Sequence, residues 1–395
     1  MKILLGTVEV CGQLHNYSEG FRKLGHQVTS VIAVKDKYFP DLKYDIDLFN
    51  LEYTFFFNKT RSKLGAIILA KILLLANTFF KGIAKKIIIN SLINQHDVFI
   101  FLWAERTLMP NFKDLEIIKQ KGKKIVFFFL GGDVRNHQAF SSQYNVTKFN
   151  FPGEFKNQSI LDSLKTIRNA EYYSDIIYSV PDQAGLAIKP YNHLQLAFDL
   201  NKYQFLIPDR DIPVIIHAPS QPWLKGTDVI LEIIDLLKKD GLVFEFKLIQ
   251  GLSNDKLLEL LSSSDILVDE IIYHGPGILS FEAMACGCAV VTKYLEKESP
   301  TSFRPPVVNV NENDLYDNLK RLISSKALRK EIAQKGREYI EKNNECKIVA
   351  NGIISDLRSE AISYNYYPSF YLEKYKPSLP SDMRIAVEIL DNKLK

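Results

Sequence analysis

The sequence has few cysteines and almost no excess of charge, and each shortage excludes a class of protein. Four cysteines in 395 residues make no disulfide framework, so we expect a reducing compartment. Cys286 and Cys288 form a C-x-C pair without the second pair that a zinc site needs. The net charge is only +4, whereas a dedicated nucleic-acid binder is usually more basic. We therefore expect no metal, no cofactor and no nucleic-acid partner.

The sequence also lacks a secretory signal and a clear membrane span. It begins directly with an apolar strand pattern at residues 1–5 and shows no signal-peptide region or cleavage site. The apolar stretch 64–80 is only 17 residues long and holds Lys71 near its middle, which is short for a membrane span. Both observations predict a cytoplasmic protein.

The segment 53–96 is strongly basic and apolar. It contains no Asp or Glu, and it has seven basic residues, namely Lys59, Arg61, Lys63, Lys71, Lys81, Lys85 and Lys86. A basic helix with an apolar face suits the surface of an anionic bilayer. A core helix whose lysines extend into solvent fits the same pattern. The first interpretation places the protein peripherally on the inner face of the membrane.

Short apolar runs alternate with helical stretches along the chain, as in parallel sheets covered on both faces. The predicted strands are 2–5, 28–34, 98–102, 124–130, 176–180, 214–217, 245–249, 266–268, 289–292 and 307–310. This alternation predicts an α/β fold with two Rossmann-like, doubly wound domains facing a cleft.

The surface chemistry of the chain changes near residue 200. Residues 1–199 hold 25 basic and 18 acidic residues, a net charge of +7, whereas the remainder carries −3. We predict two domains with different partners, an N-terminal domain over 1–199 and a C-terminal domain over 200–355. The turn-rich segment 190–213 is the candidate linker, and the tail 356–395 is expected to pack back on the N-terminal domain.

Two loops of the first half follow predicted strands, where open α/β sheets bind ligands. The loop Gly6–Gly20 lacks a G-x-G-x-x-G fingerprint, but Gly12 allows close approach of a ligand. Its alternative role is an ordinary turn. In the second loop, Asp133 is placed to accept a hydrogen bond from a hydroxyl or to orient Arg135, which is placed to bind phosphate or carboxylate. The alternative is that the two close a turn as a pair. Weaker acceptor-side candidates are His15, Glu105, Arg106 and His137.

Two loops of the second half suit a diphosphate. Lys225 lies just before a predicted helix, where an ammonium and free backbone N–H groups make an anion site; a solvated lysine is the alternative. Gly275 and Gly277 precede a second helix, whose amide end favours the same ligand. Glu282 lies one turn into that helix and suits two ribose hydroxyls, because an unpaired carboxylate among apolar residues is costly.

These motifs resemble those of family 4 glycosyltransferases, which have the GT-B fold. The residues that carry the resemblance are His217-Ala-Pro-Ser220, Lys225-Gly226-Thr227-Asp228, Ser264–Asp269 and Gly277–Gly287, with 97–101 and 132–135 in the first half. The resemblance implies transfer of a sugar from a nucleotide-sugar, usually with retention and without an obligatory metal. It further implies that Lys225 and the amides of Gly277–Leu279 neutralise the departing diphosphate and that Glu282 holds the ribose. The domain over 200–355 would then bind the nucleotide-sugar, and the domain over 1–199 would be on the acceptor side. Together with the loop residues above, the predicted donor-binding residues are Gly12, Ser220, Lys225, Gly226, Gly275, Gly277, Ile278, Leu279 and Glu282.

The sequence departs from the family pattern at three positions. A glutamate usually found eight residues before Glu282 is here His274, which donates a hydrogen bond but supplies no carboxylate; Asp269 or Glu270 is the candidate replacement. A basic residue of the family is here Ser220, a loss that Arg135 is placed to offset across the cleft. A family histidine is here Leu130. The resulting catalytic candidates are Asp133, Arg135, Lys225 and His274.

Three functions remain open from the sequence. The first is a glycosyltransferase that acts on a glycan or lipid-linked acceptor in the assembly of a bacterial surface polysaccharide. The second is a GT-B-like partner subunit that binds nucleotide or glycan without turnover, which the three departures favour. The third is a nucleotide-sugar epimerase, for which no set of acid–base carboxylates is evident.

Overall fold

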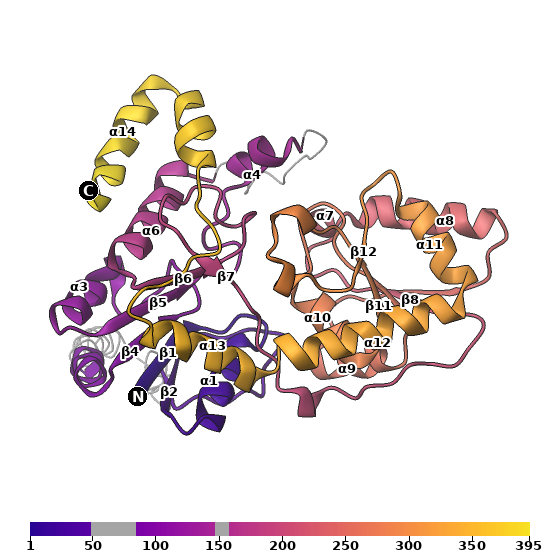
Figure 1. The fold of residues 1–395 in the computed structure, drawn as a ribbon, viewed down its shortest axis with the longest axis horizontal. Coiled ribbons are helices and arrows are strands. Elements are labelled where there is room, and N and C mark those ends of the chain that lie inside the picture. The colour runs from indigo at the N-terminus through magenta and orange to yellow at the C-terminus, as the bar shows by residue number, and fades with distance from the viewer. Residues whose placement is uncertain (49–83, 147–157) are drawn as a thin grey trace, which may run out of the picture.

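The computed structural model describes residues 1–48, 84–146 and 158–395, and it shows two α/β domains joined side by side (Figure 1). The N-terminal sheet has the strand order β3-β2-β1-β4-β5-β6-β7, and the C-terminal sheet has the order β12-β11-β10-β8-β9. Every strand pair of both sheets is parallel. The predicted fold of two doubly wound domains is confirmed.

In the N-terminal domain, nearly continuous apolar strands form the sheet and helices cover both faces. The strands are β1 (Lys2–Val8), β2 (Gln27–Val34), β3 (Ile46–Asp47), β4 (Val98–Phe101), β5 (Lys124–Phe128), β6 (Ile176–Ser179) and β7 (Asn192–His193). The helices are α1 (Gln13–Lys23), α3 (Lys113–Gln120), α4 (His137–Tyr144) and α6 (Ile160–Tyr173), and residues 84–95 are also helical.

The C-terminal domain repeats this arrangement on a smaller sheet. Its strands are β8 (Val214–His217), β9 (Glu245–Leu248), β10 (Ile266–Val268), β11 (Ala289–Thr292) and β12 (Val308–Asn309). Its helices are α7 (Pro222–Lys225), α8 (Thr227–Lys239), α9 (Asn254–Ser262), α10 (Ile278–Cys286), α11 (Leu315–Ser324) and α12 (Lys326–Asn343).

All ten predicted strands are present, and two observed strands were not predicted. The prediction of an irregular linker over 190–213 was wrong at its start, because Asn192 and His193 of β7 pair with Tyr178 and Ser179 of β6. Strands of two residues, such as β3 and β7, are too short to show a period in the sequence.

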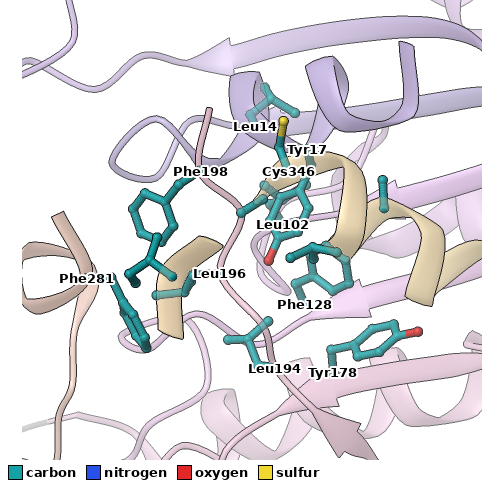
Figure 2. Packing of buried hydrophobic residues seen from close by; sticks show 14 of the residues in the cluster. Leu14, Tyr17, Leu102, Phe128, Tyr178, Leu194, Leu196, Phe198, Phe281 and Cys346 are labelled. Atoms are coloured by element: carbon teal, nitrogen blue, oxygen red, sulfur yellow. The ribbon is translucent and has the colours of Figure 1, made fainter. Parts of the chain in front are cut away.

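The chain crosses between the domains twice, first around residues 193–198 and again around 344–346, and backbone hydrogen bonds join the two crossings. In the second crossing, Cys346 donates its backbone N–H to the carbonyl of Phe198, while Phe198 donates to the carbonyl of Asn344, at 2.9 and 2.8 Å. Helix α1 also holds the first crossing, since Gln13 exchanges two hydrogen bonds with the backbone of Ala197. Figure 2 shows Phe198 and Leu196 of this crossing packed between the two domains.

After the second crossing the chain returns to the N-terminal domain. Helix α13 (Cys346–Arg358) packs along α1, and α14 (Ser381–Asp391) packs against α6 (Figure 1). The fully buried Arg168 guanidinium of α6 anchors α14 through an ion pair with Asp391 at 2.8 Å, and it also pairs with Glu171 at 2.7 Å.

Most of the basic segment 53–96 lies outside the described residues, so its predicted membrane contact stays a prediction. Of the part that is described, Ile89, Leu92 and Ile93 are buried in the N-terminal core, whereas Ile87 is exposed. Within the described ranges, no helix combines the length and the apolar character that crossing a membrane requires.

The close contact of α1 with α13 depends on Gly20, which makes a prediction. A Cβ atom at Gly20 would lie 2.2 Å from the carbonyl oxygen of Cys346, so Gly20→Ala must push the helices apart. We expect it to lower the free energy of unfolding by roughly 1–3 kcal/mol in urea denaturation.

The matched control for this prediction is Gly352→Ala in α13. A Cβ there has 4.0 Å to its nearest neighbour, Gln195 Oε1, so alanine is accommodated. We expect this variant to raise the free energy of unfolding by about 0.4–1 kcal/mol. Equal effects of the two substitutions would contradict the role assigned to Gly20.

Candidate functional site

A cleft separates the two domains at the carboxyl ends of their strands. Residues of both domains line it: Leu130, Arg135 and 180–183 on the N-terminal side, and Glu270, 274–278 and Phe281 on the C-terminal side. Segment 193–196 of the first crossing lies between them. Ligands of open α/β sheets bind at this edge, where loops rather than strands supply the polar groups.

The N-terminus of α10 points its free amides toward this cleft. The helix begins at Ile278, after Gly277, and no side chain caps it. Throughout the described part of the chain, no protein group accepts a hydrogen bond from the backbone N–H of Gly277, Ile278 or Leu279. Unpaired amides at a helix start carry partial positive charge and favour an anion.

Lys225 lies beside these amides, in contact with two carboxylates. Its ammonium is 2.8 Å from Asp269 Oδ1 and 3.3 Å from Glu270 Oε2, at the carboxyl end of β10. A Cβ atom at Gly277 would be 3.2 Å from Glu270 Oε1 and 3.7 Å from Lys225 Nζ, which places the cluster over the start of α10. Ser280 completes it by donating to Asp269 Oδ2 at 2.6 Å.

The charges in this cluster determine its protonation. Burial alone would lower the pKa of Lys225, but the two adjacent carboxylates raise it, so the ammonium stays charged. Burial raises the pKa of Glu270 above its ordinary value, although Lys225 opposes that shift. The cluster is therefore one fixed cation with two carboxylates, and the predicted replacement carboxylates, Asp269 and Glu270, do lie here.

The corresponding helix start in the N-terminal domain is occupied by protein. Glu9, which is 4% exposed, accepts from the backbone N–H groups of Leu14 and His15 in α1 at 3.1 and 3.3 Å. Tyr44 donates to the same carboxylate at 3.0 Å. Burial raises the pKa of Glu9 to about 7. An anionic ligand would have to displace this carboxyl from α1, whereas the start of α10 is open.

Glu282 is held one turn into α10 by two polar neighbours that the sequence did not reveal. Asn254 of α9 donates to Glu282 Oε1 at 2.9 Å, and the Tyr203 hydroxyl forms a second hydrogen bond. Burial raises the pKa of Glu282 to about 7. The backbone N–H of Asn254 also donates to the carbonyl of Tyr38 in the N-terminal domain, so this glutamate lies near the domain junction.

Arg135 lines the cleft, but its charge is already partnered. Its guanidinium pairs with Asp182 at 2.6 Å and lies over the Tyr273 ring, 4.8 Å from the centroid. The Arg135 Nε is buried without a hydrogen-bond partner. The prediction that Arg135 offsets Ser220 across the cleft stays untested, and any phosphate there would compete with Asp182.

Asp133 does not pair with Arg135, contrary to the turn-closing pair that was the alternative. Its two oxygens accept from the backbone N–H of Ala104 at 2.9 Å and of Leu130 at 3.3 Å, and it is 2% exposed. Burial raises the pKa of Asp133 to about 7. This geometry makes Asp133 a link between two loops, and its catalytic role stays a prediction.

His274 and His137 lie where the domains meet, in an aromatic contact. Phe140 of α4 stacks on Tyr273 at 4.3 Å, and the Tyr144 ring meets His274 edge-on at 4.4 Å. His137 hydrogen-bonds the Tyr273 hydroxyl. Burial lowers the pKa of His274 to about 3 and that of His137 to about 4, so both are neutral at pH 7.

The remaining predicted residues are spread around the site. Ser220 is exposed beside α7, and Gly226 joins α7 to α8 with φ +77°, against the side chains of Ile271 and Ile272. Gly12 starts α1 with φ +79°, against Phe39. His15 lies on α1, and Glu105 and Arg106 are exposed. His15, Glu105 and Arg106 are not among the residues that line the cleft, so their acceptor role stays a prediction.

Sequence reasoning missed the residues that hold the predicted ones. Asp182 pairs with Arg135, and Asn254 and Tyr203 bind Glu282, yet each lies far from its partner along the chain. Glu9 alone had a local signal, because it precedes α1 by four residues and follows the first apolar run.

The raised pKa of Glu282 predicts that its glutamine variant loses part of the pH dependence of stability. Between the ordinary value of 4.5 and about 7 the folded chain binds a proton that the unfolded chain lacks, so wild-type stability falls as pH rises through this window. Glutamine cannot ionise. In urea denaturation, we expect the free energy of unfolding of Glu282→Gln, taken relative to that of the wild type, to rise by about 2 kcal/mol between pH 5 and pH 8.

The exposed Glu259→Gln is the control, because a solvated carboxyl has no burial cost. A gain of the same size in this variant, or none in Glu282→Gln, would show that burial does not govern Glu282.

Comparison with known proteins places the fold. Residues 210–355 match the family described as glycosyl transferase-like. No curated protein matches the sequence. The sucrose-phosphate synthase of Thermosynechococcus elongatus superposes with a TM-score of 0.57 at 13% identity, over 91% of this chain and 98% of its own.

Two other solved structures are similar over the same extent. An alpha-glucosyltransferase in complex with UDP and DNA gives a TM-score of 0.53 at 14% identity, over 90% of this chain and 99% of its own. A trehalose-6-phosphate synthase gives 0.53 at 10% identity, over 91% and 99%. At these identities, the superpositions establish the fold alone. The chain has the GT-B fold of two Rossmann-like domains, and its residues 210–355 match the glycosyl transferase-like family.

Proposed function

We propose that the chain is a glycosyltransferase that moves a sugar from a nucleotide-sugar to a glycan or lipid-linked acceptor. The observation that carries this proposal is the open amide end of α10 beside the Lys225 ammonium, inside a cleft lined by both domains. Fixed donors of this kind stabilise the negative charge that develops on a departing diphosphate. The glycosyl transferase-like match covers this same part of the chain.

In the proposed reaction, the bond between the anomeric carbon and the diphosphate oxygen breaks, and the electron pair stays on that oxygen. The acceptor hydroxyl oxygen bonds the anomeric carbon, and its proton leaves to the departing phosphate. The amides of Gly277–Leu279 and Lys225 would hold the diphosphate, and Glu282 would bind the ribose hydroxyls. Asp269 and Glu270 keep the ammonium charged and aimed at the site until the diphosphate arrives.

We further propose retention at the anomeric carbon, no required metal, and a role in assembly of a bacterial surface polysaccharide. The structure of the trehalose-6-phosphate synthase with the same fold is described as bearing on glycosyltransfer with retention, which supports the first point. Lys225 and the α10 amides supply positive charge without a metal, which supports the second. The basic and apolar sequence of 53–96 suits a lipid-linked acceptor at an anionic membrane surface.

A second candidate is a partner subunit that binds nucleotide without turnover. The pairing of the Arg135 guanidinium with Asp182 and of the Asp133 carboxylate with backbone N–H groups favours it, because both catalytic candidates of the N-terminal domain already have protein partners. The two candidates differ in one observable, which is breakdown of a bound nucleotide-sugar.

Nucleotide binding and donor breakdown test the proposal together. A thermal-shift screen with UDP, GDP and CDP should find one that stabilises the wild type by about 2.7 kcal/mol at a hundred times its dissociation constant. Donor hydrolysis with the matching nucleotide-sugars, with and without EDTA, should then be detectable and unaffected by EDTA. Binding without hydrolysis or transfer for every donor would support the partner subunit instead.

Removing the Lys225 ammonium should weaken both nucleotide binding and donor hydrolysis. We expect Lys225→Met to weaken diphosphate binding at least tenfold and to lower donor hydrolysis at least a hundredfold, because the two carboxylates would then repel the diphosphate. Lys247→Met, on the edge strand β9, is the control and should keep both activities. Unchanged hydrolysis in Lys225→Met would refute the site.

A further inference from the structure

A second cavity lies beside the cleft, on the other side of the first crossing. Its walls come from β5–β7, from α13 and from the C-terminal segment after it, with Phe303 of the C-terminal domain at one side. The cavity and the cleft share four lining residues, which are His193, Leu194, Gln195 and Phe303. A molecule that extends along the crossing could therefore occupy both spaces.

The polar lining of this cavity suits hydroxyl groups rather than an anion. Among the described residues that line it, Asp356 is the one carboxylate, and no lysine or arginine is present. Tyr178 and Asn192 donate to Asp356 Oδ2 at 2.6 and 3.2 Å, which fixes the carboxylate in the wall. Amide and hydroxyl side chains make up most of the remaining polar lining. Neutral donors and acceptors of this kind match a polyhydroxylated ligand.

An aromatic face adjoins these polar groups. The rings of His193 and Phe303 lie flat on each other, with centroids 4.6 Å apart and an angle of 7° between their planes. His193 is fixed by a hydrogen bond of 2.7 Å with the Tyr366 hydroxyl. Burial lowers the pKa of His193 to about 4, so the His193 ring is neutral at pH 7 and the ring pair carries no charge. The C–H face of a sugar ring packs against such a surface while its hydroxyls bind polar groups at the edge.

Asn192 supplies an independent sign of a missing partner. Its side chain is part of the cavity wall and is 4% exposed, yet its Oδ1 has no hydrogen-bond partner. A buried acceptor without a partner destabilises the fold, because it has given up its hydrogen bond to water. A ligand hydroxyl that donates to this oxygen would remove the cost.

Gly352 keeps the cavity open without a structural need for glycine. It lies inside α13, where glycine is less favourable than alanine because it loses more backbone freedom on folding. Packing explains the glycine at Gly20, where a Cβ would strike Cys346, and at Gly336, where it would crowd Met284. At Gly352 the nearest atom is 4.0 Å away, so any side chain there would extend over the cavity instead.

We propose that this cavity binds a neutral sugar ring, namely the part of the acceptor glycan that precedes the reacting residue. Its binding chemistry stands on the cavity alone, whereas its assignment to the acceptor rests on the proposed transferase function. The shared wall of His193–Gln195 and Phe303 would lead from this ring into the cleft, where the diphosphate site lies.

A cavity-filling variant with a matched control tests the proposal. We expect a methyl glycoside of glucose, galactose, mannose or N-acetylglucosamine to bind the full-length wild type and Gly352→Ala at millimolar concentration in ligand-observed NMR. Gly352→Trp should weaken that binding at least tenfold, and Phe303→Leu at least threefold. Equal binding by wild type and Gly352→Trp, or no binding of any of the four up to 100 mM, would overturn the proposal.

Two further measurements separate the possible failures. The UDP, GDP and CDP thermal shifts should be equal in wild type, Gly352→Ala and Gly352→Trp, which shows that the tryptophan variant is folded and that the cleft is intact. Loss of nucleotide binding in all three would count against the transferase function but not against sugar binding. If the cavity holds acceptor, the disaccharide and trisaccharide of the bound sugar should bind more tightly than its methyl glycoside. Equal affinities would identify a free monosaccharide and overturn the acceptor assignment.

Discussion

The geometry of the molecule depends on the mutual hold of the two crossing segments. Phe198 and Asn344–Cys346 exchange backbone hydrogen bonds, and one hydrophobic cluster runs from Leu14 in the N-terminal domain to Phe281 in the C-terminal domain (Figure 2). This junction borders both candidate binding spaces, because residues 193–195 of the first crossing and Phe303 of the C-terminal domain line the cleft and the second cavity alike.

The two domains differ in what lies at the N-terminus of the helix that faces the cleft edge of each sheet. Each places a helix start at the carboxyl edge of its sheet, where unpaired amides attract an anion. In the N-terminal domain Glu9 fills that position, whereas in the C-terminal domain the amides of α10 stay open and Lys225 is held next to them. The Asp269 and Glu270 carboxylates keep this lysine from extending into solvent. An anionic ligand thus has one strongly favoured place, and the other half of the cleft is available to a neutral acceptor.

The strands and the start of α10 were predictable because they leave local signals. An apolar run of four to seven residues marks a buried strand, and glycine before an apolar helix marks the start of α10. The partners of these residues leave no such signal, since Asp182 is 47 positions from Arg135 and Asn254 is 28 from Glu282. Asp133 is a further example, because its carboxylate accepts from the backbone N–H of Ala104 in another loop, a contact that no side-chain pattern encodes.

Contacts on two sides of the cleft connect nucleotide binding with the position of the domains. On one side, Phe140 of α4 is buried in the C-terminal core against Tyr273. On the other, the Asn254 side chain binds Glu282 while its backbone N–H binds Tyr38 of the opposite domain. A ribose that takes over Glu282 would compete with Asn254 for that carboxylate, and thereby disturb a residue that bridges the domains. Because backbone hydrogen bonds between the two crossings oppose sliding, we expect such a change to favour rotation about the crossings, which is the closure motion that two-domain folds use around ligands.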